Sequence, residues 1–486
     1  MVFSSLDFLF FFLPIVMIVY FFSNTKVRNV ILLVSGLFFY AWGEPFYIII
    51  MLISTAIDYT AGRLIAKYDD DDKKRRVFLI VSVCMNVGLL SIFKYSDFIF
   101  NNISTLVGTQ VTNPVLYVNR ALNNAFDLGL STDHVDLPIG ISFFTFQSMS
   151  YTIDLYLRNI KVQKSFLSFA AYISMFPQIV AGPIVRYEDV AAEIDSRTVN
   201  MSKISVGIGI FIKGLAKKVL LANNIGALWT TVKAMDYGSL PALTAWIGIL
   251  AFTFQIYFDF SGYSDMAMGL GKMMGFNFPE NFDHPYISES ISEFWRRWHI
   301  TLGSWFRSYV YIPLGGNRKG TARTLINLLI VWGLTGLWHG ASWNFVLWGL
   351  YFGVIIVIER VGLGKLLEKL PRFVRIIYTF LLTVFGWILF DTDTLSDAGH
   401  YFLALFGGGG SFADSYSVYL LAANALMLIV CAVGSTMLPS KLYSKLKLRT
   451  GAASGYIMPA VQAAVLIICS AYLVDATYNP FMYFRF

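Results

Sequence analysis

Two histidines have the chemistry and the setting of catalytic residues. His339 lies in the run GLWHGASWNFVLWG, and no charged residue occurs between Arg323 and Glu359. An ionisable side chain in such an apolar stretch is costly, so it indicates a functional site. A neutral imidazole can take the proton of a hydroxyl group that attacks a thioester, which is general-base catalysis of acyl transfer. The alternative is a structural histidine hydrogen-bonded to a neighbouring helix.

His299 is the second candidate and occurs in the segment SEFWRRWHITLGSWF. The apolar spacing predicts a single helix over residues 292–306. Its aromatic face would consist of Trp295, Trp298, Leu302 and Trp305. His299, Arg296 and Arg297 point away from that face. Two interpretations stay open: an amphipathic helix at the membrane interface with snorkelling arginines, or the wall of an active site that offers arginine to a phosphate.

Other catalytic and metal-binding signatures are missing from the sequence. There is no GxSxG, HExxH, Walker A or Rossmann-type GxGxxG motif, which argues against the enzyme classes that carry them. The three cysteines have no CxxC spacing, and the two histidines have no third ligand at a matching distance along the chain, so no metal site is predicted. A transporter that binds a polar solute or relays protons through the histidines is the alternative to an enzyme.

The elements that position these residues must be membrane helices. The chain has 486 residues, of which 56% are hydrophobic and only 14% are charged, whereas soluble domains are about a quarter charged. We therefore expect an all-α, polytopic membrane protein with about 11–13 transmembrane or re-entrant helices. The net charge of +7 fits basic cytoplasmic loops and does not indicate nucleic-acid binding. Apolar runs lie at 6–22, 30–42, 45–61, 77–93, 138–157, 166–184, 204–222, 240–260, 323–338, 342–358, 373–390, 417–437 and 456–475.

The distribution of basic residues predicts the orientation of the chain. The stretch between Arg375 and Lys441, which holds two spans and the loop DTDTLSDAGHYFLALFGGGGSFADSYS, has no Lys or Arg, and 95–135 has one, so that loop and 95–135 are expected outside. A rise of about 1.5 Å per residue from Arg323 then places His339 well past the bilayer midplane. The basic segments, expected in the cytoplasm, are 63–76, 158–164, 213–218, 318–323, 360–375 and 441–449.

Several segments of the chain, in order, resemble a known family. They are FYAWGEP, ISFFTFQSMSYTID, FPQIVAGPIVRY, QIYFDFSGYSDMAMGLGKMMGFNFPENFDHPYIS, EFWRRWHITLGSWFRSYVYIPLGGNRKG and GLWHGASWNFVLWGLYFG. With these segments the sequence resembles the membrane-bound O-acyltransferase family, and within it the bacterial branch typified by the integral membrane component of alginate O-acetylation. The match covers most of the chain, which we interpret as a single domain over 1–486 with a polar catalytic core at about 255–345.

The resemblance implies a ring of membrane helices around a central funnel, which the acyl donor enters from the cytoplasm and the acceptor from outside. It implies that His339 is the catalytic base and that His299 positions the donor carbonyl or stabilises the developing oxyanion. The residues expected to bind the phosphates of coenzyme A, with lipid headgroups as the alternative, are Arg296, Arg297 and Arg307.

Supporting roles in the site follow from the same resemblance. Trp338 precedes His339 directly and is expected to support it. Asp259 and Asp265 of FDFSGYSD are expected either to orient the catalytic groups or to make structural hydrogen bonds.

The resemblance further implies acetyl-CoA as the donor substrate and no permanently bound cofactor. The implied acceptor is an extracytoplasmic polysaccharide, such as an alginate-like exopolysaccharide, cellulose or peptidoglycan. The implied partner is an extracytoplasmic acetyltransferase or another polysaccharide-modifying protein, and membrane lipids surround the chain in the bacterial inner (plasma) membrane. D-alanyl transfer to teichoic acid is the alternative reaction.

Overall fold

The protein is built from helices, as the composition predicts. The computed structural model describes residues 1–180, 182–475 and 482, and in these ranges the only β-type pairing is an isolated bridge between Phe282 and Trp298. The predicted all-α, polytopic fold is confirmed. Seven helical segments within the described residues are long and apolar enough to cross a membrane. They are Ile48–Lys67, Asp72–Val107, Ala242–Met273, Trp343–Leu367, Arg372–Asp391, Ser415–Gly434 and Ser454–Asp475.

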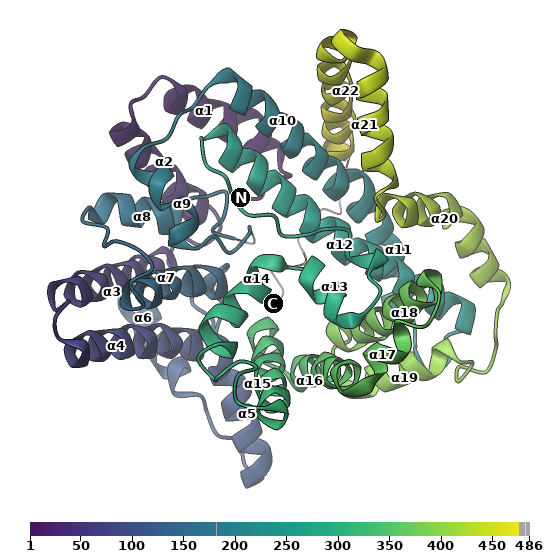
Figure 1. The fold of residues 1–486 in the computed structure, drawn as a ribbon. Coiled ribbons are helices and arrows are strands. Elements are labelled where there is room, and N and C mark those ends of the chain that lie inside the picture. Colours follow the sequence, from purple (N-terminus) through teal and green to yellow (C-terminus); the bar gives the residue numbers. More distant parts are fainter. Residues whose placement is uncertain (181, 476–481, 483–486) are drawn as a thin grey trace.

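The N-terminal part contains the helices η1 (Phe8–Phe12), α1 (Leu13–Phe21), α2 (Thr25–Ala41), α3 (Ile48–Lys67), α4 (Asp72–Leu90), η2 (Ser91–Tyr95), α5 (Ser96–Val107), α6 (Pro114–Phe126), α7 (Ile141–Tyr156), α8 (Phe166–Ser174) and α9 (Tyr187–Asp195). Helices α3, α4 and α7 lie side by side (Figure 1). Buried Asp58 of α3 accepts hydrogen bonds from Ser82 Oγ at 2.5 Å and Asn86 Nδ2 at 2.8 Å, both on α4. Such interhelical bonds satisfy polar groups that water does not reach.

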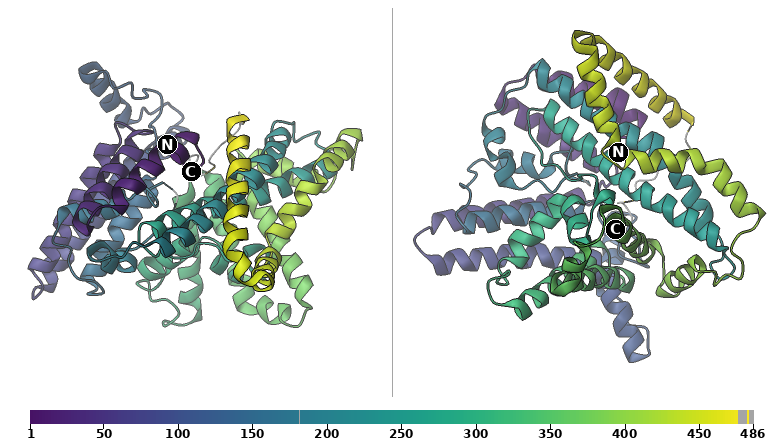
Figure 2. Two further views of the ribbon diagram at one scale, coloured as in Figure 1. Left: turned by 90° about the horizontal axis from the view of Figure 1, so that it is seen from above. Right: turned by 45° about the vertical axis from the view of Figure 1, so that its right-hand side comes forward.

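The segment 95–135, predicted to be a long external loop, contains the helices α5 and α6. It projects from the rest of the helices (Figure 2). It is linked to the segment that follows His339, because the indole N–H of Trp343 donates to Asn102 Oδ1 at 3.0 Å.

The central part contains α10 (Met201–Ala216), η3 (Lys217–Ala222), α11 (Asn223–Lys233), α12 (Ala242–Met273), η4 (Pro285–Ile287), α13 (Ile291–Arg297), α14 (Ile300–Phe306), η5 (Arg307–Tyr311), α15 (Thr321–His339) and α16 (Trp343–Ile358). Glycines let two pairs of these helices approach closely. A Cβ on Gly214 of α10 would lie 2.5 Å from the carbonyl oxygen of Gly262 of α12, and one on Gly349 of α16 would lie 2.3 Å from the carbonyl oxygen of Trp332 of α15. Small residues serve this purpose in membrane helix packing.

The C-terminal part contains η6 (Glu359–Leu363), α17 (Gly364–Leu367), α18 (Arg372–Asp391), α19 (Leu395–Leu405), α20 (Ser415–Gly434), α21 (Leu438–Thr450), η7 (Gly451–Ala453) and α22 (Ser454–Asp475). Helix α18 packs against α12 and α16, whereas α20 and α22 lie at the edge of the molecule (Figure 1). Most residues of α20 and α22 are exposed and apolar, which fits contact with lipid. The short helices α13 and α14 lie near the middle of the fold (Figure 1).

Candidate active site

The segment 292–306 is not the single helix that its apolar spacing predicts. Helix α13 ends at Arg297 and α14 begins at Ile300. Between them Trp298 is extended, with φ −104° and ψ 128°, and His299 adopts the left-handed conformation with φ 46° and ψ 53°. The prediction of one continuous helix is therefore wrong, because the helix is interrupted at His299.

A neighbouring segment, 281–283, causes this break. The Ile300 N–H donates to the carbonyl oxygen of Asn281 at 3.0 Å, and the Asp283 N–H donates to the carbonyl oxygen of Arg297 at 2.9 Å. These bonds take the backbone groups that would continue the helix through His299. A long-range pairing has overridden the local periodicity, which a sequence pattern does not report.

Asn281 also fixes the tautomer of His299. Its Oδ1 accepts from the Thr301 backbone N–H at 3.1 Å and from Thr301 Oγ1 at 2.9 Å, and it lies 3.2 Å from His299 Nδ1. Because the backbone N–H can only donate, the atom it meets is the amide oxygen, and His299 Nδ1 must carry the hydrogen. In the neutral ring the lone pair then lies on Nε2. Sequence reasoning did not select Asn281.

His339 is the last residue of α15 and is 3% exposed. Its ring lies among aromatic side chains, with centroid distances of 5.0 Å to Trp338, 4.8 Å to Trp348 and 5.3 Å to Phe390. Its Nδ1 is buried without a hydrogen-bond partner in the part of the chain that the structure describes, and so are the indole N–H groups of Trp338 and Trp348. The site therefore presents polar atoms that can bond to a substrate.

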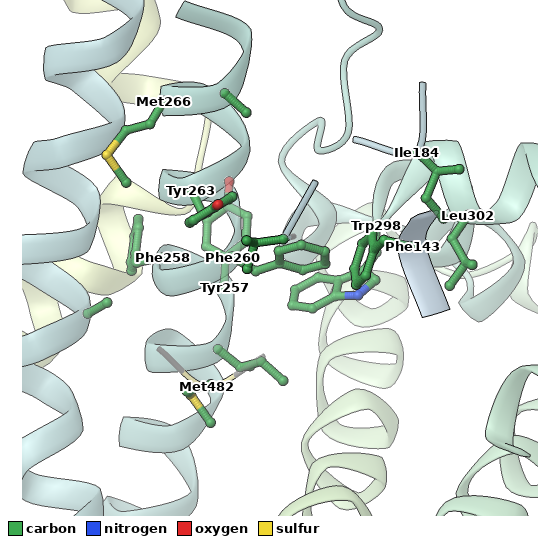
Figure 3. Packing of buried hydrophobic residues seen from close by; sticks show 14 of the residues in the cluster. Phe143, Ile184, Tyr257, Phe258, Phe260, Tyr263, Met266, Trp298, Leu302 and Met482 are labelled. Atoms are coloured by element: carbon green, nitrogen blue, oxygen red, sulfur yellow. The ribbon is translucent and has the colours of Figure 1, made fainter. Parts of the chain in front are cut away.

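Trp338 joins the two predicted catalytic residues. Its ring centroid lies 6.0 Å from that of His299 and 5.0 Å from that of His339. The structure thus brings together His299, which directly precedes α14, and Trp338 and His339, which end α15. Aromatic residues surround them: the ring centroid of Phe260 of α12 lies 4.8 Å from that of His299, and that of Phe143 of α7 lies 5.4 Å from that of Trp338, and both phenylalanines belong to the buried cluster shown in Figure 3.

A cavity of about 630 Å³ reaches His299 between α13, α14, α15 and α16. Buried His299 and Trp298 lie at its inner end, whereas the arginines that line it are exposed. One face of α15 forms a wall through Leu328, Val331, Trp332 and Thr335. These positions are successive turns of one helical stripe, and its next turn carries Trp338 and His339. The cavity therefore reaches His299 beside α15, and His339 lies one turn of α15 beyond the residues that line it.

Three arginines line this cavity, and they differ from the predicted set by one residue. Arg296 and Arg307 line it as expected, and Arg360 of η6 joins them. None of these three forms an ion pair within the described residues. Arg297 does not line the cavity, because its guanidinium pairs with Glu293 at 2.8 Å and with Asp283 at 3.6 Å.

The two aspartates predicted as supporting residues lie away from the cavity. Asp259 of α12 pairs with Lys218 Nζ at 2.5 Å, and both side chains are buried. Asp265 pairs with Lys213 at 3.1 Å and Lys217 at 2.7 Å. These ion pairs join α12 to α10 and η3, which favours the structural alternative for both aspartates. Among the described residues no three His, Cys, Asp or Glu side chains are grouped as metal ligands.

Residues 36–389 match the family model described as MBOAT, membrane-bound O-acyltransferase family. The chain belongs to this family. It is therefore a membrane-embedded O-acyltransferase, a multi-pass protein of a bacterial membrane.

Three relatives illustrate the range of the family around this chain. A protein named probable alginate O-acetylase AlgI from Pseudomonas putida is 36% identical over 505 residues, with 100% of both chains covered. A peptidoglycan O-acetyltransferase from Helicobacter pylori is 32% identical over 438 residues, which cover 82% of this chain and 78% of that one. A teichoic acid D-alanyltransferase from Bacillus subtilis is 28% identical over 280 residues, which cover 52% and 68%.

Proposed function

We propose that this O-acyltransferase transfers acetyl groups from cytoplasmic acetyl-CoA to hydroxyl groups of an extracytoplasmic polysaccharide, together with a partner transferase outside the membrane. One observation carries the proposal. A cavity reaches His299 beside α15, and the arginines at its exposed end form no ion pair within the described residues. The face of α15 that lines the cavity continues to His339. This arrangement places groups suited to phosphate at the mouth of the cavity and a buried base one turn of α15 beyond its inner end.

The cavity has the chemistry that a coenzyme A thioester requires. Arg296, Arg307 and Arg360 carry guanidinium groups suited to phosphates. The basic segment 318–323 before α15 is on the cytoplasmic side by its charge, so the donor enters from the cytoplasm. Deeper in, Trp295, Trp332 and Leu302 offer an apolar wall to the pantetheine arm.

The two histidines divide the chemistry between them. The acceptor hydroxyl forms a bond to the acyl carbon while the C–S bond breaks, and the hydroxyl proton passes to His339 and then to the leaving thiolate. His299 Nε2, at the inner end of the cavity, carries the lone pair of the neutral ring, so it positions the donor by accepting a hydrogen bond from an amide N–H of the pantetheine arm. Trp338 packs against both rings and keeps water away.

The acceptor side of the proposal is supported by the far end of α15. Helix α15 is 19 residues long and ends in His339, which is about 28 Å of helix. Beside that end, α5 is tied to α16 through Asn102 and Trp343, and the α5–α6 segment projects beyond the helices (Figure 2). This segment is the docking platform we propose for the partner protein.

Acetyl transfer is favoured over D-alanyl transfer by the comparisons. The relatives named as O-acetylases or O-acetyltransferases align over at least 82% of this chain, whereas those named D-alanyltransferases align over 47–52%. The acceptors in these names are alginate, peptidoglycan and teichoic acid, and the acetylated ones are glycans. We therefore assign a polysaccharide as acceptor.

The test measures ester-linked acids on surface glycans. Cells without this gene are complemented with wild type, His339→Ala or His339→Gln, and alkali-released short acids are quantified on each purified glycan. We expect acetate to fall to the level of the deletion strain in both variants at equal membrane abundance. The glycan that loses acetate identifies the acceptor.

Purified protein provides the matching test of the donor. Thiol release from acetyl-CoA should depend on His339, and D-alanyl-charged carrier protein should not support turnover. If the variants keep full glycan acetate, the proposed catalytic role of His339 is wrong. If D-alanine replaces acetate among the released acids, the proposed donor is wrong.

A further inference from the structure

A buried lysine that plays no part in the proposed reaction lies against the catalytic helix. Lys94 is 8% exposed and belongs to η2, a π-helical turn between α4 and α5. It has no ion pair within the described residues, although it lies in a segment long and apolar enough to cross the membrane. π-helical turns often occur at functional sites, and an intramembrane lysine without a carboxylate needs another source of stabilisation.

The amino group of Lys94 is bonded to the end of α15. Its Nζ donates to the carbonyl oxygen of Trp338 at 2.6 Å, to that of His339 at 3.3 Å and to Ser142 Oγ at 3.2 Å. These three contacts match the three N–H donors of an ammonium group. The same Nζ lies 5.8 Å from the centre of the Trp338 ring.

Together with its neighbour, Lys94 completes the end of α15. The last four carbonyl groups of a helix have no partner within it. Here the Gly340 N–H donates to Gly336 O at 3.3 Å, the Tyr95 hydroxyl to Leu337 O at 2.8 Å, and Lys94 to the remaining two. The carbonyl end of a helix carries partial negative charge, which a lysine complements.

The depth of the two residues along their helices agrees. Lys94 follows Arg76 by 18 residues, and His339 follows Arg323 by 16 residues. At about 1.5 Å per residue these are rises of roughly 27 and 24 Å from the cytoplasmic arginines. The hydrogen bonds of Lys94 therefore lie at the level of His339, on the acceptor side of the membrane.

We propose that Lys94 is a positioning residue for the acyl transfer: it holds the final turn of α15 so that the His339 imidazole keeps one orientation toward the acceptor hydroxyl. This inference rests on the proposed function, since it concerns how His339 acts as base. Lys94 does not line the donor cavity. Its loss is therefore expected to act on the rate of the chemical step and not on donor binding.

The experiment compares Lys94→Met and Lys94→Gln with wild type in purified protein in lipid nanodiscs, with acetyl-CoA as donor, the glycan that loses acetate in the cellular test as acceptor, and thiol release as readout. Methionine keeps the unbranched stem without donors, and glutamine keeps N–H donors without charge. We expect kcat to fall about 100-fold in Lys94→Met, the size seen when a catalytic group is misplaced by about 1 Å. The KM for acetyl-CoA should stay within about twofold, and Lys94→Gln should recover part of kcat.

The matched control is Lys203→Met. Lys203 also donates from Nζ to a backbone carbonyl, that of Thr198 at 3.0 Å, but it is only partly buried and lies far along the chain from the site. Its loss should leave kcat unchanged.

A double variant distinguishes positioning from general stability. If Lys94 acts through His339, adding Lys94→Met to His339→Ala should not lower the residual rate further. Additive losses, a raised KM with unchanged kcat, or wild-type kcat in both Lys94 variants would overturn the inference. If Lys94→Met does not fold, the same comparison of kcat and KM is made with Lys94→Gln. If neither variant folds, Lys94 has a structural role and the inference is overturned. Failure of the proposed function is seen separately, as full activity in His339→Ala.

Discussion

Two adjacent arginines provide a sharp test of the donor-binding cavity. Arg296 lines the cavity and has no ion pair within the described residues, whereas Arg297 pairs with Glu293 and Asp283 outside it. We compare Arg296→Gln with Arg297→Gln, since both remove one positive charge from the same helix. If the cavity holds the phosphates of coenzyme A, only the first should weaken donor binding.

The size of the effect follows from the exposure of Arg296. A hydrogen bond to a charged group contributes about 1.5–3 kcal/mol when water is excluded. Arg296 lies at the exposed end of the cavity, so solvent screening reduces this to about 1 kcal/mol. That corresponds to a rise of about fivefold in the KM for acetyl-CoA. Removing all three cavity arginines should raise KM about 100-fold, less if the losses are not additive.

The assay is thiol release by purified protein over a range of acetyl-CoA concentrations, with the acceptor glycan held constant, at low and high salt. S-acetyl-pantetheine, which lacks the phosphates of coenzyme A, serves as the comparison donor. With it, wild type and Arg296→Gln should have equal KM values, and high salt should reduce the difference seen with acetyl-CoA. An equal rise in KM for Arg297→Gln, or none for Arg296→Gln, would refute the assignment of the cavity to the donor.

Two further predictions concern the groups that support the site. Asn281→Ala removes the acceptor of the His299 Nδ1 hydrogen and should lower the rate of thiol release about tenfold, the effect of losing one buried hydrogen bond. Asn281→Asp is the control, because it keeps an acceptor oxygen. Equal activity in wild type and Asn281→Ala would contradict the assigned tautomer. Lys218→Met leaves the buried carboxylate of Asp259 without its lysine and should lower the free energy of unfolding by about 3–5 kcal/mol. The measurement is the Tm of the purified protein, and an unchanged Tm would exclude a stabilising role for this pair.

The sequence predicted the residues of the site better than the contacts between them. His299, His339 and Trp338 lie together in the structure. They could be predicted because each is an ionisable or aromatic residue in a segment with a clear signal. Asn281 carried no such signal, since an asparagine in FNFPENFDHP has the composition of an ordinary turn. Its role depends on a backbone pairing between segments 281–283 and 297–300, which no local period encodes.

Lys94 was missed for a different reason. It follows the predicted span 77–93 directly, where a lysine is the normal mark of a membrane boundary. In the structure the helix continues through η2 into α5, so the lysine is buried against another helix. A useful signal was available in its neighbours: SIFKYSDFIF contains no arginine or second lysine, unlike the basic cytoplasmic segments.

The break at His299 explains why an aromatic stripe that predicts one helix serves two. Trp295 of α13 packs against Trp348 of α16 at 5.4 Å, whereas Trp305 of α14 stacks on Phe146 of α7 at 3.7 Å. A continuous helix would present both tryptophans to one neighbour, because they lie on one face. Turning the chain at His299 sends them to two different walls of the site.

That turn has an energetic cost, and the site offsets it. A non-glycine residue held at positive φ costs about 1–3 kcal/mol, and such strain persists only where surrounding contacts impose it. Here the contacts are the backbone pairing of Ile300 with Asn281 and the bond from His299 Nδ1 to the same residue. The strained residue is thus the one whose ring lies where the two walls meet, beside Trp338 at the inner end of the cavity. A regular helix through His299 would relieve the strain but would move the imidazole away from the proposed position of the thioester. We therefore expect acyl transfer to require the backbone conformation of His299 as well as its imidazole.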